Sequence, residues 1–162
     1  MNTTPSEILG GYSSLAEQMI AGQTELVLIA EDPYIAIGVE GGSDTPYLLL
    51  LPEGSVFEDK RTDNLRVIKS RNIVTKFKDS NVREIKTCAT ISFRSLSQAS
   101  ALLLDVLVET AVETRDIILV AELTQDFIEL FTPARSLSPE EVLGLFGELF
   151  VIWSSADRDT MA

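Results

Sequence analysis

Carboxylates are the most abundant side chains in this sequence that could do chemistry. The chain has 25 Asp and Glu residues, 13 Lys and Arg residues, one cysteine and no histidine. Carboxylate oxygens are the hard ligands that Mg²⁺ prefers, so a small Mg²⁺ enzyme is one function that the composition permits. The lack of histidine excludes Ser-His-Asp and Cys-His catalysis and most zinc sites. Neither a phosphate-binding glycine loop nor a nucleophile elbow is present, so the enzymatic interpretation ranks below two others.

Charge is distributed in three blocks along the chain. Residues 1–59 hold ten acidic residues and no basic one, residues 60–94 hold ten basic and three acidic residues, and residues 95–162 hold twelve acidic and three basic residues. The net charge of −12 opposes non-specific binding to nucleic acid or to anionic membranes, and it favours a basic partner. The basic block could contact phosphates or a partner. We favour the alternative, in which it balances the charge of the acidic helices, either within the fold or at an oligomer interface. Its candidate nucleic-acid-binding or partner-binding residues are Lys60, Arg61, Arg66, Lys69, Arg71, Lys76, Lys78, Arg83 and Lys86.

The bulk composition is that of a globular chain. Its 162 residues are 45% hydrophobic and 23% charged, which favours one domain, residues 1–162, that buries a core without a metal or a disulfide. There is no apolar run of about 18 residues, so we expect no membrane contact. Residues 1–5 lack the basic and apolar regions of a signal peptide. A lone cysteine, Cys88, fits a reducing compartment, so we expect a cytoplasmic protein.

The first 94 residues predict one N-terminal helix and then a strand-rich region. Thr4, Pro5 and Glu7 have the spacing of a capping box with proline at the first helical position, and Gly22 is the predicted stop. Alternation and turn residues predict strands at 25–30, 34–39, 46–51, 65–77 and 82–93. Residues 78–81 are expected to close the last two strands as a hairpin.

The strand at 82–93 alternates most clearly. Its odd-numbered side chains, from 83 to 93, form the more apolar face, and its even-numbered side chains, Cys88 among them, form a polar face. This pattern predicts a half-solvated antiparallel strand.

Residues 95–154 predict three helices. Ser95 or Ser97 caps a helix to about residue 112, and a second segment spans 116–131, although 117–121 also fits a buried strand. Ser138 and Glu141 have capping-box spacing at the start of the third helix, and residues 155–162 are expected to form a flexible tail. The predicted fold class is α+β: an N-terminal helix, a mainly antiparallel sheet of about five strands, and C-terminal helices packed on it.

Residues 138–149, with the sequence SPEEVLGLFGEL, resemble the GL-x-GEL helix of an uncharacterised bacterial family of PD-(D/E)xK restriction-nuclease-like proteins. That family occurs beside phage-defence genes. The layout that precedes the motif here is a strand-rich region, an aromatic residue (Phe93) and then helices, and it is similar to the leading half of that family.

The resemblance implies a chain that lacks the chemical part of a nuclease. In that superfamily the GEL helix precedes a strand with Asp and a strand with Glu/Asp-x-Lys, which hold Mg²⁺ and activate water. Fourteen residues follow Glu148, so we expect neither strand here, and Glu148 alone carries over, as an outer metal or water ligand. The expectation is no cofactor and no DNA cleavage by this chain alone. A nuclease core that completes it in cis or in trans would make a Mg²⁺-dependent endonuclease.

An upstream version of the same motif is the remaining catalytic candidate. Glu84, Ile85 and Lys86 form an E-x-K triplet on a predicted strand, and Asp63 lies 21 residues before Glu84. Such triplets are common by chance, and a basic block supplies them readily. The catalytic candidates are therefore Glu148, Glu84, Lys86 and Asp63, which form no complete site, and the sequence predicts no metal ligand set.

The last predicted helix carries an apolar stripe that we expect a partner to cover, with Leu145, Leu149 and Trp153 as interface residues. Gly144 and Gly147 each cost about 1 kcal/mol relative to alanine within a helix, which the close approach of another backbone would offset. The favoured function is a non-catalytic interaction module in a larger assembly, as an oligomer or with a protein partner. The alternative is an acidic DNA-mimic or inhibitor that binds a basic nucleic-acid enzyme, which the basic block fits poorly.

Overall fold

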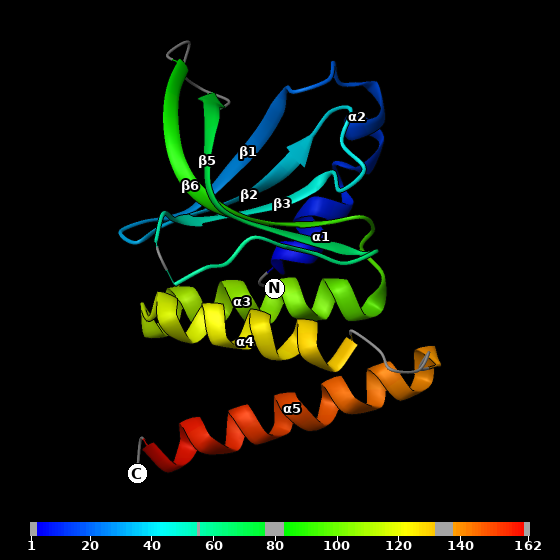
Figure 1. Cartoon of the computed structure of the whole chain (residues 1–162), viewed down its shortest axis with the longest axis vertical. Helices are drawn as coiled ribbons and strands as arrows, with labels where there is room; N and C mark the ends of the chain where they lie inside the picture. The colour runs from blue at the N-terminus through cyan, green and yellow to red at the C-terminus, as the bar shows by residue number, and fades with distance from the viewer. Residues whose placement is uncertain (1–2, 55, 77–82, 132–137, 161–162) are drawn as a thin grey trace.

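The computed structural model describes residues 3–54, 56–76, 83–131 and 138–160, with side chains described up to residue 154 of the last helix. Two short helices come first, then six strands, then three helices. Figure 1 shows how they are arranged. The elements are α1 (Pro5–Gly10), α2 (Ser13–Gln18), β1 (Thr24–Glu31), β2 (Tyr34–Glu40), β3 (Tyr47–Pro52), β4 (Lys60–Arg61), β5 (Leu65–Lys76), β6 (Arg83–Phe93), α3 (Gln98–Thr114), α4 (Ile117–Phe131) and α5 (Pro139–Thr160). The predicted α+β class is confirmed.

The N-terminal capping box forms as its spacing predicts. The Thr4 side chain accepts from the backbone N–H of Glu7, and the Glu7 carboxylate accepts from the backbone N–H of Thr4. The single predicted helix is instead two, because the first ends at Gly10, Tyr12 leaves helical geometry, and the second starts at Ser13. The Asp105 carboxylate on α3 accepts two hydrogen bonds from Ser6, at 2.6 and 2.7 Å, which fixes α1 against α3.

The sheet is antiparallel throughout, and its strand order is β1-β2-β3-β6-β5-β4. Five of its strands lie where alternation predicts them, and the short edge strand β4 is additional. The β5–β6 pairing is the predicted hairpin, while its turn at 78–81 lies outside the described residues.

The sheet curls, so that both of its faces are buried except at the first half of β6 and the part of β5 that pairs with it. One face packs on the helices through Ile37, Leu49 and Ile91, and the other encloses a second cluster made of Leu26, Ala36, Leu48, Leu50, Ile73 and Cys88. The prediction of a half-solvated strand at 82–93 is therefore wrong for its second half. Alternation assigns the two faces correctly, but the curl covers the polar face as well, and the Cys88 side chain is 1% exposed.

Three features produce the curl. Register shifts interrupt β1 between Leu28 and Ala30 and β5 between Ile68 and Arg71, and such bulges bend a strand. The Thr24 hydroxyl on β1 donates to the Val74 carbonyl on β5 at 3.0 Å, which joins two strands that are not neighbours in the sheet order. Figure 1 shows β5 and β6 bending away from the helices towards β1.

The helices form layers on one side of the sheet. Leu104 and Leu107 of α3 are fully buried against the sheet, α4 lies beside α3, and α5 is the outermost element (Figure 1). Ser97 caps α3, as predicted. Residues 117–121 are helical, so the strand alternative for this segment is excluded.

The last helix begins where its capping box predicts, because Ser138 and Glu141 exchange both capping hydrogen bonds. It continues to Thr160, whereas the sequence interpretation ended it near residue 154 and assigned a flexible tail. The Ser154 hydroxyl donates to the Phe150 carbonyl one turn earlier, a bond that a helix accommodates, and no proline or glycine follows to interrupt it.

Candidate functional site

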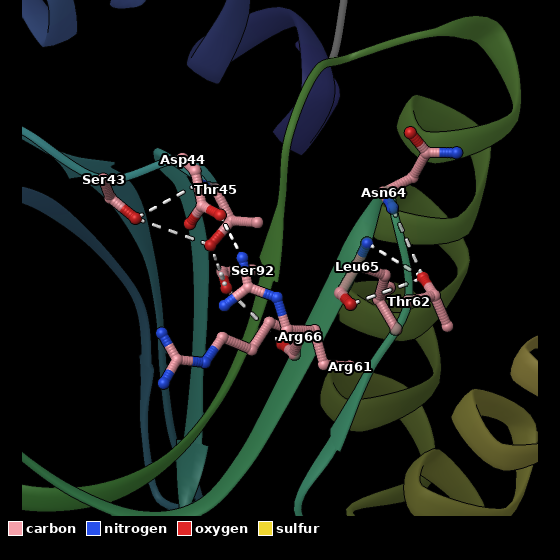
Figure 2. Close-up of polar contacts among 9 residues, drawn as sticks. All are labelled: Ser43, Asp44, Thr45, Arg61, Thr62, Asn64, Leu65, Arg66 and Ser92. Atoms are coloured by element: carbon pink, nitrogen blue, oxygen red, sulfur yellow. Dashed lines mark hydrogen bonds and ion pairs between the residues drawn. The ribbon is translucent and has the colours of Figure 1, made fainter.

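Arg61, on the edge strand β4, is held by the fold. Its guanidinium pairs with the Asp44 carboxylate, and Figure 2 shows the contact between β4 and the turn before β3. This turn before β3 is also fixed to β6 by a hydrogen bond between the hydroxyls of Thr45 and Ser92, whose oxygens lie 2.9 Å apart. This pair lies within the chain, as expected if the basic block balances acidic residues of the fold.

Arg71 and Lys86 also have partners inside the chain. The Arg71 guanidinium crosses the inner face of the curled sheet to the Glu40 carboxylate, which is 9% exposed. The Lys86 ammonium lies 3.5 Å from the centre of the Tyr34 ring, a cation–π contact. Of the other bases, Lys69 and Arg83 are exposed, and Lys60 and Arg66 are half-buried. The Lys76 side chain and Lys78 lie outside the described part of the chain.

The E-x-K triplet and its distant aspartate do not come together. Glu84 and Lys86 are exposed near one end of the β5–β6 ladder, where Thr75 pairs with Glu84. Asp63 precedes the opposite end, where Leu65 pairs with Phe93. The nine residue steps from Glu84 to Phe93 along β6 amount to roughly 30 Å of strand at a rise of about 3.3 Å per residue. Among the described residues no cluster of three Cys, Asp or Glu side chains has the geometry to hold a metal ion.

The inner face of the sheet holds the groups with shifted pKa values. Burial raises the pKa of the Cys88 thiol to about 11. Burial also raises the pKa of the Tyr34 phenol, with smaller contributions from Cys88 and Glu84. The hydroxyls of Tyr34 and Thr90 are buried there without a hydrogen-bond partner in the described part of the chain. A thiol with this pKa is a packed core group rather than a nucleophile.

A groove lies between α5 and the helices α3 and α4. Its volume is about 240 Å³. The rings of Phe127 and Phe146, which both line it, pack edge to face with their centroids 5.6 Å apart. Two of the predicted interface residues, Leu149 and Trp153, line it, while Leu145 is half-buried on the same helix and does not. The lining residues are Leu103, Val106, Leu123, Asp126, Phe127, Phe146, Leu149, Phe150, Ile152 and Trp153.

The α5 helix exposes more apolar side chains than the sequence analysis recognised, both in the groove (Ile152) and outside it (Val151). Val151 is 61% exposed and Ile152 is 65% exposed, and Glu148, the carry-over candidate, is exposed beside them. Spacing of four residues puts Gly144, Glu148 and Ile152 on one side of the helix. That spacing was available in the sequence. It was overlooked because the residues nearer the core form the longer apolar stripe.

The glycines of α5 have open space around them. A Cβ built on Gly144 or on Gly147 meets no atom of the described residues within 4 Å beyond its immediate chain neighbourhood. No neighbouring element in the described chain therefore makes the close approach that the sequence analysis expected to offset their cost.

A second cavity, of about 500 Å³, lies between residues 56–58 and α4. Its floor is apolar, with Phe57, Val67 and Ile128, and Glu58 and Glu122 are exposed at its edge. None of the residues that the sequence singled out contributes to it.

Comparisons with known proteins assign no relative: no family model matches the chain, and neither a curated protein nor a solved structure matches it. In the described residues, none of the helices combines the length and the apolar character that crossing a membrane requires.

Proposed function

We propose that this chain is a non-catalytic interaction module that acts in a larger assembly and docks on its partner through α5. The observation that carries the proposal is the exposure of large apolar side chains on one side of a helix that is already packed on the fold. Ile152 is the most exposed of them, and Leu149 and Phe150 are also exposed beside the groove. Apolar patches of this kind on a folded surface mark sites of interaction.

The glycines of α5 support the same surface. Each of Gly144 and Gly147 destabilises an isolated helix by about 1 kcal/mol relative to alanine. Since nothing in the described chain lies close to either position, the fold gains no packing from their small size. A partner whose backbone approaches α5 closely would need the small size of these two glycines.

The resemblance to the PD-(D/E)xK nuclease family gives the proposed assembly a biological setting in phage defence. The GLFGEL motif forms part of α5, so the helix that precedes the catalytic strands in that family is also the helix with the exposed apolar side here. On this proposal a nuclease core, in cis or in trans, covers α5 and binds the Mg²⁺. Glu148 is exposed and would face that core.

A photo-crosslinking residue at position 152, in cells of the native host, tests the proposal. Position 118 is the matched control, because Ile118 is an exposed isoleucine (57%) on the neighbouring helix α4. We expect one discrete crosslinked protein from position 152 that mass spectrometry identifies reproducibly, and no such product from position 118. The absence of any product at 152, or the same products at both positions, would overturn the proposal.

The DNA-mimic alternative has one observation in its favour. Helices α3, α4 and α5 carry eleven acidic residues and a single basic one, Arg158. A mimic presents carboxylates along its whole contact face, whereas the exposed side of α5 has Val151 and Ile152 in the middle. Competition with duplex DNA for a basic enzyme, unaffected by a neutral substitution at position 152, would favour the mimic over the docking module.

A further inference from the structure

The charged residues on the helices that form the α5 groove are nearly all acidic. Asp126 lines the groove, and Glu148 precedes the lining residue Leu149, whereas Glu122 of α4 lies at the edge of the second cavity. The three helices that form the groove contain no basic residue other than Arg158, near the end of α5. The groove is therefore an apolar strip with the carboxylate of Asp126 in its lining and Glu148 next to it in the sequence.

The size of the groove favours side chains over a small molecule. Small-molecule sites usually have volumes of about 300–1,000 Å³, and this groove, at about 240 Å³, is smaller. The groove also runs along α5, since its lining residues Phe146, Leu149 and Trp153 recur at helical spacing. Such a row of apolar residues accepts the anchors of an amphipathic helix.

We infer that the α5 groove binds an amphipathic helix of a partner protein whose apolar anchors are flanked by Lys and Arg. The inference rests on the proposed function and adds the chemistry of the partner. The anchors fill the space over Phe127 and Phe146, and the flanking bases lie against Asp126 and Glu148. Complementary charge at the rim raises the association rate and rejects acidic partners, while the apolar contact supplies most of the affinity.

A second copy of this chain fits the groove less well. Each copy has a net charge of −12, and the same acidic helices would face each other across a symmetric contact. Like charges placed opposite one another at an interface cost several kcal/mol, so this surface disfavours self-association.

Trp153 is the only tryptophan in the chain and lines the groove, so its fluorescence reports occupancy directly. The probes are two designed helical peptides of the same length, one of leucine and lysine and one of leucine and glutamate. We expect the lysine peptide to shift Trp153 emission to shorter wavelength and to bind at least about tenfold more tightly than the glutamate peptide. The affinity of the lysine peptide should fall as salt rises, because added ions screen the rim charges.

Three variants separate the groove from the surface as a whole. Ile152→Ser removes an exposed lining side chain without changing charge and should weaken binding of the lysine peptide about fivefold or more, while Ile118→Ser, outside the groove, should not weaken it. Asp126→Asn should reduce the salt dependence and the preference over the glutamate peptide. Far-UV circular dichroism of each variant confirms that the fold is kept.

The outcomes distinguish this inference from the proposed function. Equal binding of the two peptides, or binding that Ile152→Ser leaves unchanged, overturns the basic amphipathic partner but leaves docking through α5 intact. If neither peptide binds while position 152 still crosslinks to a discrete protein, the partner has another chemistry and the inference fails alone. A dimer in sedimentation equilibrium that Ile152→Ser dissociates makes a second copy the occupant and also overturns it.

Discussion

The inner face of the curled sheet and the exposed surface of α5 have opposite mismatches between side chain and surroundings. The inner face buries polar groups, including the Glu40 carboxylate and the Cys88 thiol, yet the fold supplies Arg71 for the carboxylate. The α5 helix exposes apolar groups such as Ile152, which lines the groove. On the inner face the chain pairs its buried carboxylate itself, although the Tyr34 and Thr90 hydroxyls lack a partner among the described residues. For the exposed apolar side chains of α5 we propose that a partner covers them.

The largest expected effect comes from the ion pair inside the sheet. Arg71→Ala leaves the Glu40 carboxylate buried without its cation, and breaking a buried pair in this way costs about 3 kcal/mol of unfolding free energy. The matched control is Arg61→Ala, whose pair with Asp44 is about half exposed on both sides and is therefore worth about 0–1 kcal/mol. Urea unfolding of the two variants measures both values. Equal losses would show that the inner face is not a closed interior.

The buried thiol gives the next effect. Because burial raises the pKa of Cys88 to about 11, we expect alkylation by iodoacetamide at pH 8 to be at least about 100-fold slower in the folded chain than in urea. The change of folding stability with pH follows from the same pKa shift. The folded state holds the thiol proton more tightly, so the stabilisation is complete below the unfolded pKa near 9 and is lost as the pH rises towards 11. Fast labelling at pH 8 without denaturant would contradict the closed inner face.

Gly38 tests how closely the strands of the curled sheet approach. A Cβ at this position would overlap the Glu25 carbonyl of β1 and would lie 2.6 Å from the Leu26 side chain. Since the neighbouring backbone cannot move aside cheaply, we expect Gly38→Ala to lower the unfolding free energy by about 2 kcal/mol. Gly10→Ala is the control, because no atom lies within 4 Å of the added carbon at the end of α1. A thermal melt that ranks the two variants the other way would rule out the tight approach.

Gly147→Ala has the smallest expected effect, and it should raise stability while lowering crosslinking to the partner. Gly147→Ala should raise the unfolding free energy of the isolated chain by up to about 1 kcal/mol, because alanine favours the helix and meets nothing nearby. The same change should reduce crosslinking from position 152 if a partner backbone approaches α5 closely. A stabilised variant that crosslinks as well as the parent would place the partner away from this glycine.

Local patterns in the sequence determined most of the elements. The capping boxes at Thr4 and Ser138 predict two helix starts, and alternation predicts five strands close to their observed bounds. These features depend on contacts between residues close together in the chain, so spacing alone reveals them. The break at Gly11 and the continuation of α5 to Thr160 were missed because helix ends depend on small differences in free energy.

Only the tertiary structure decided which polar face is buried and which apolar face is exposed. Alternation separates Cys88 from Ile91 on β6, but no local pattern reveals that the sheet curls over the Cys88 side. Helical periodicity likewise places Ile152 and Leu149 on α5 without showing that α3 and α4 form with α5 an open groove that both residues line. Burial is a property of contacts between distant segments. The sequence therefore determines the two faces of each element, and the packing of the elements decides what covers each face.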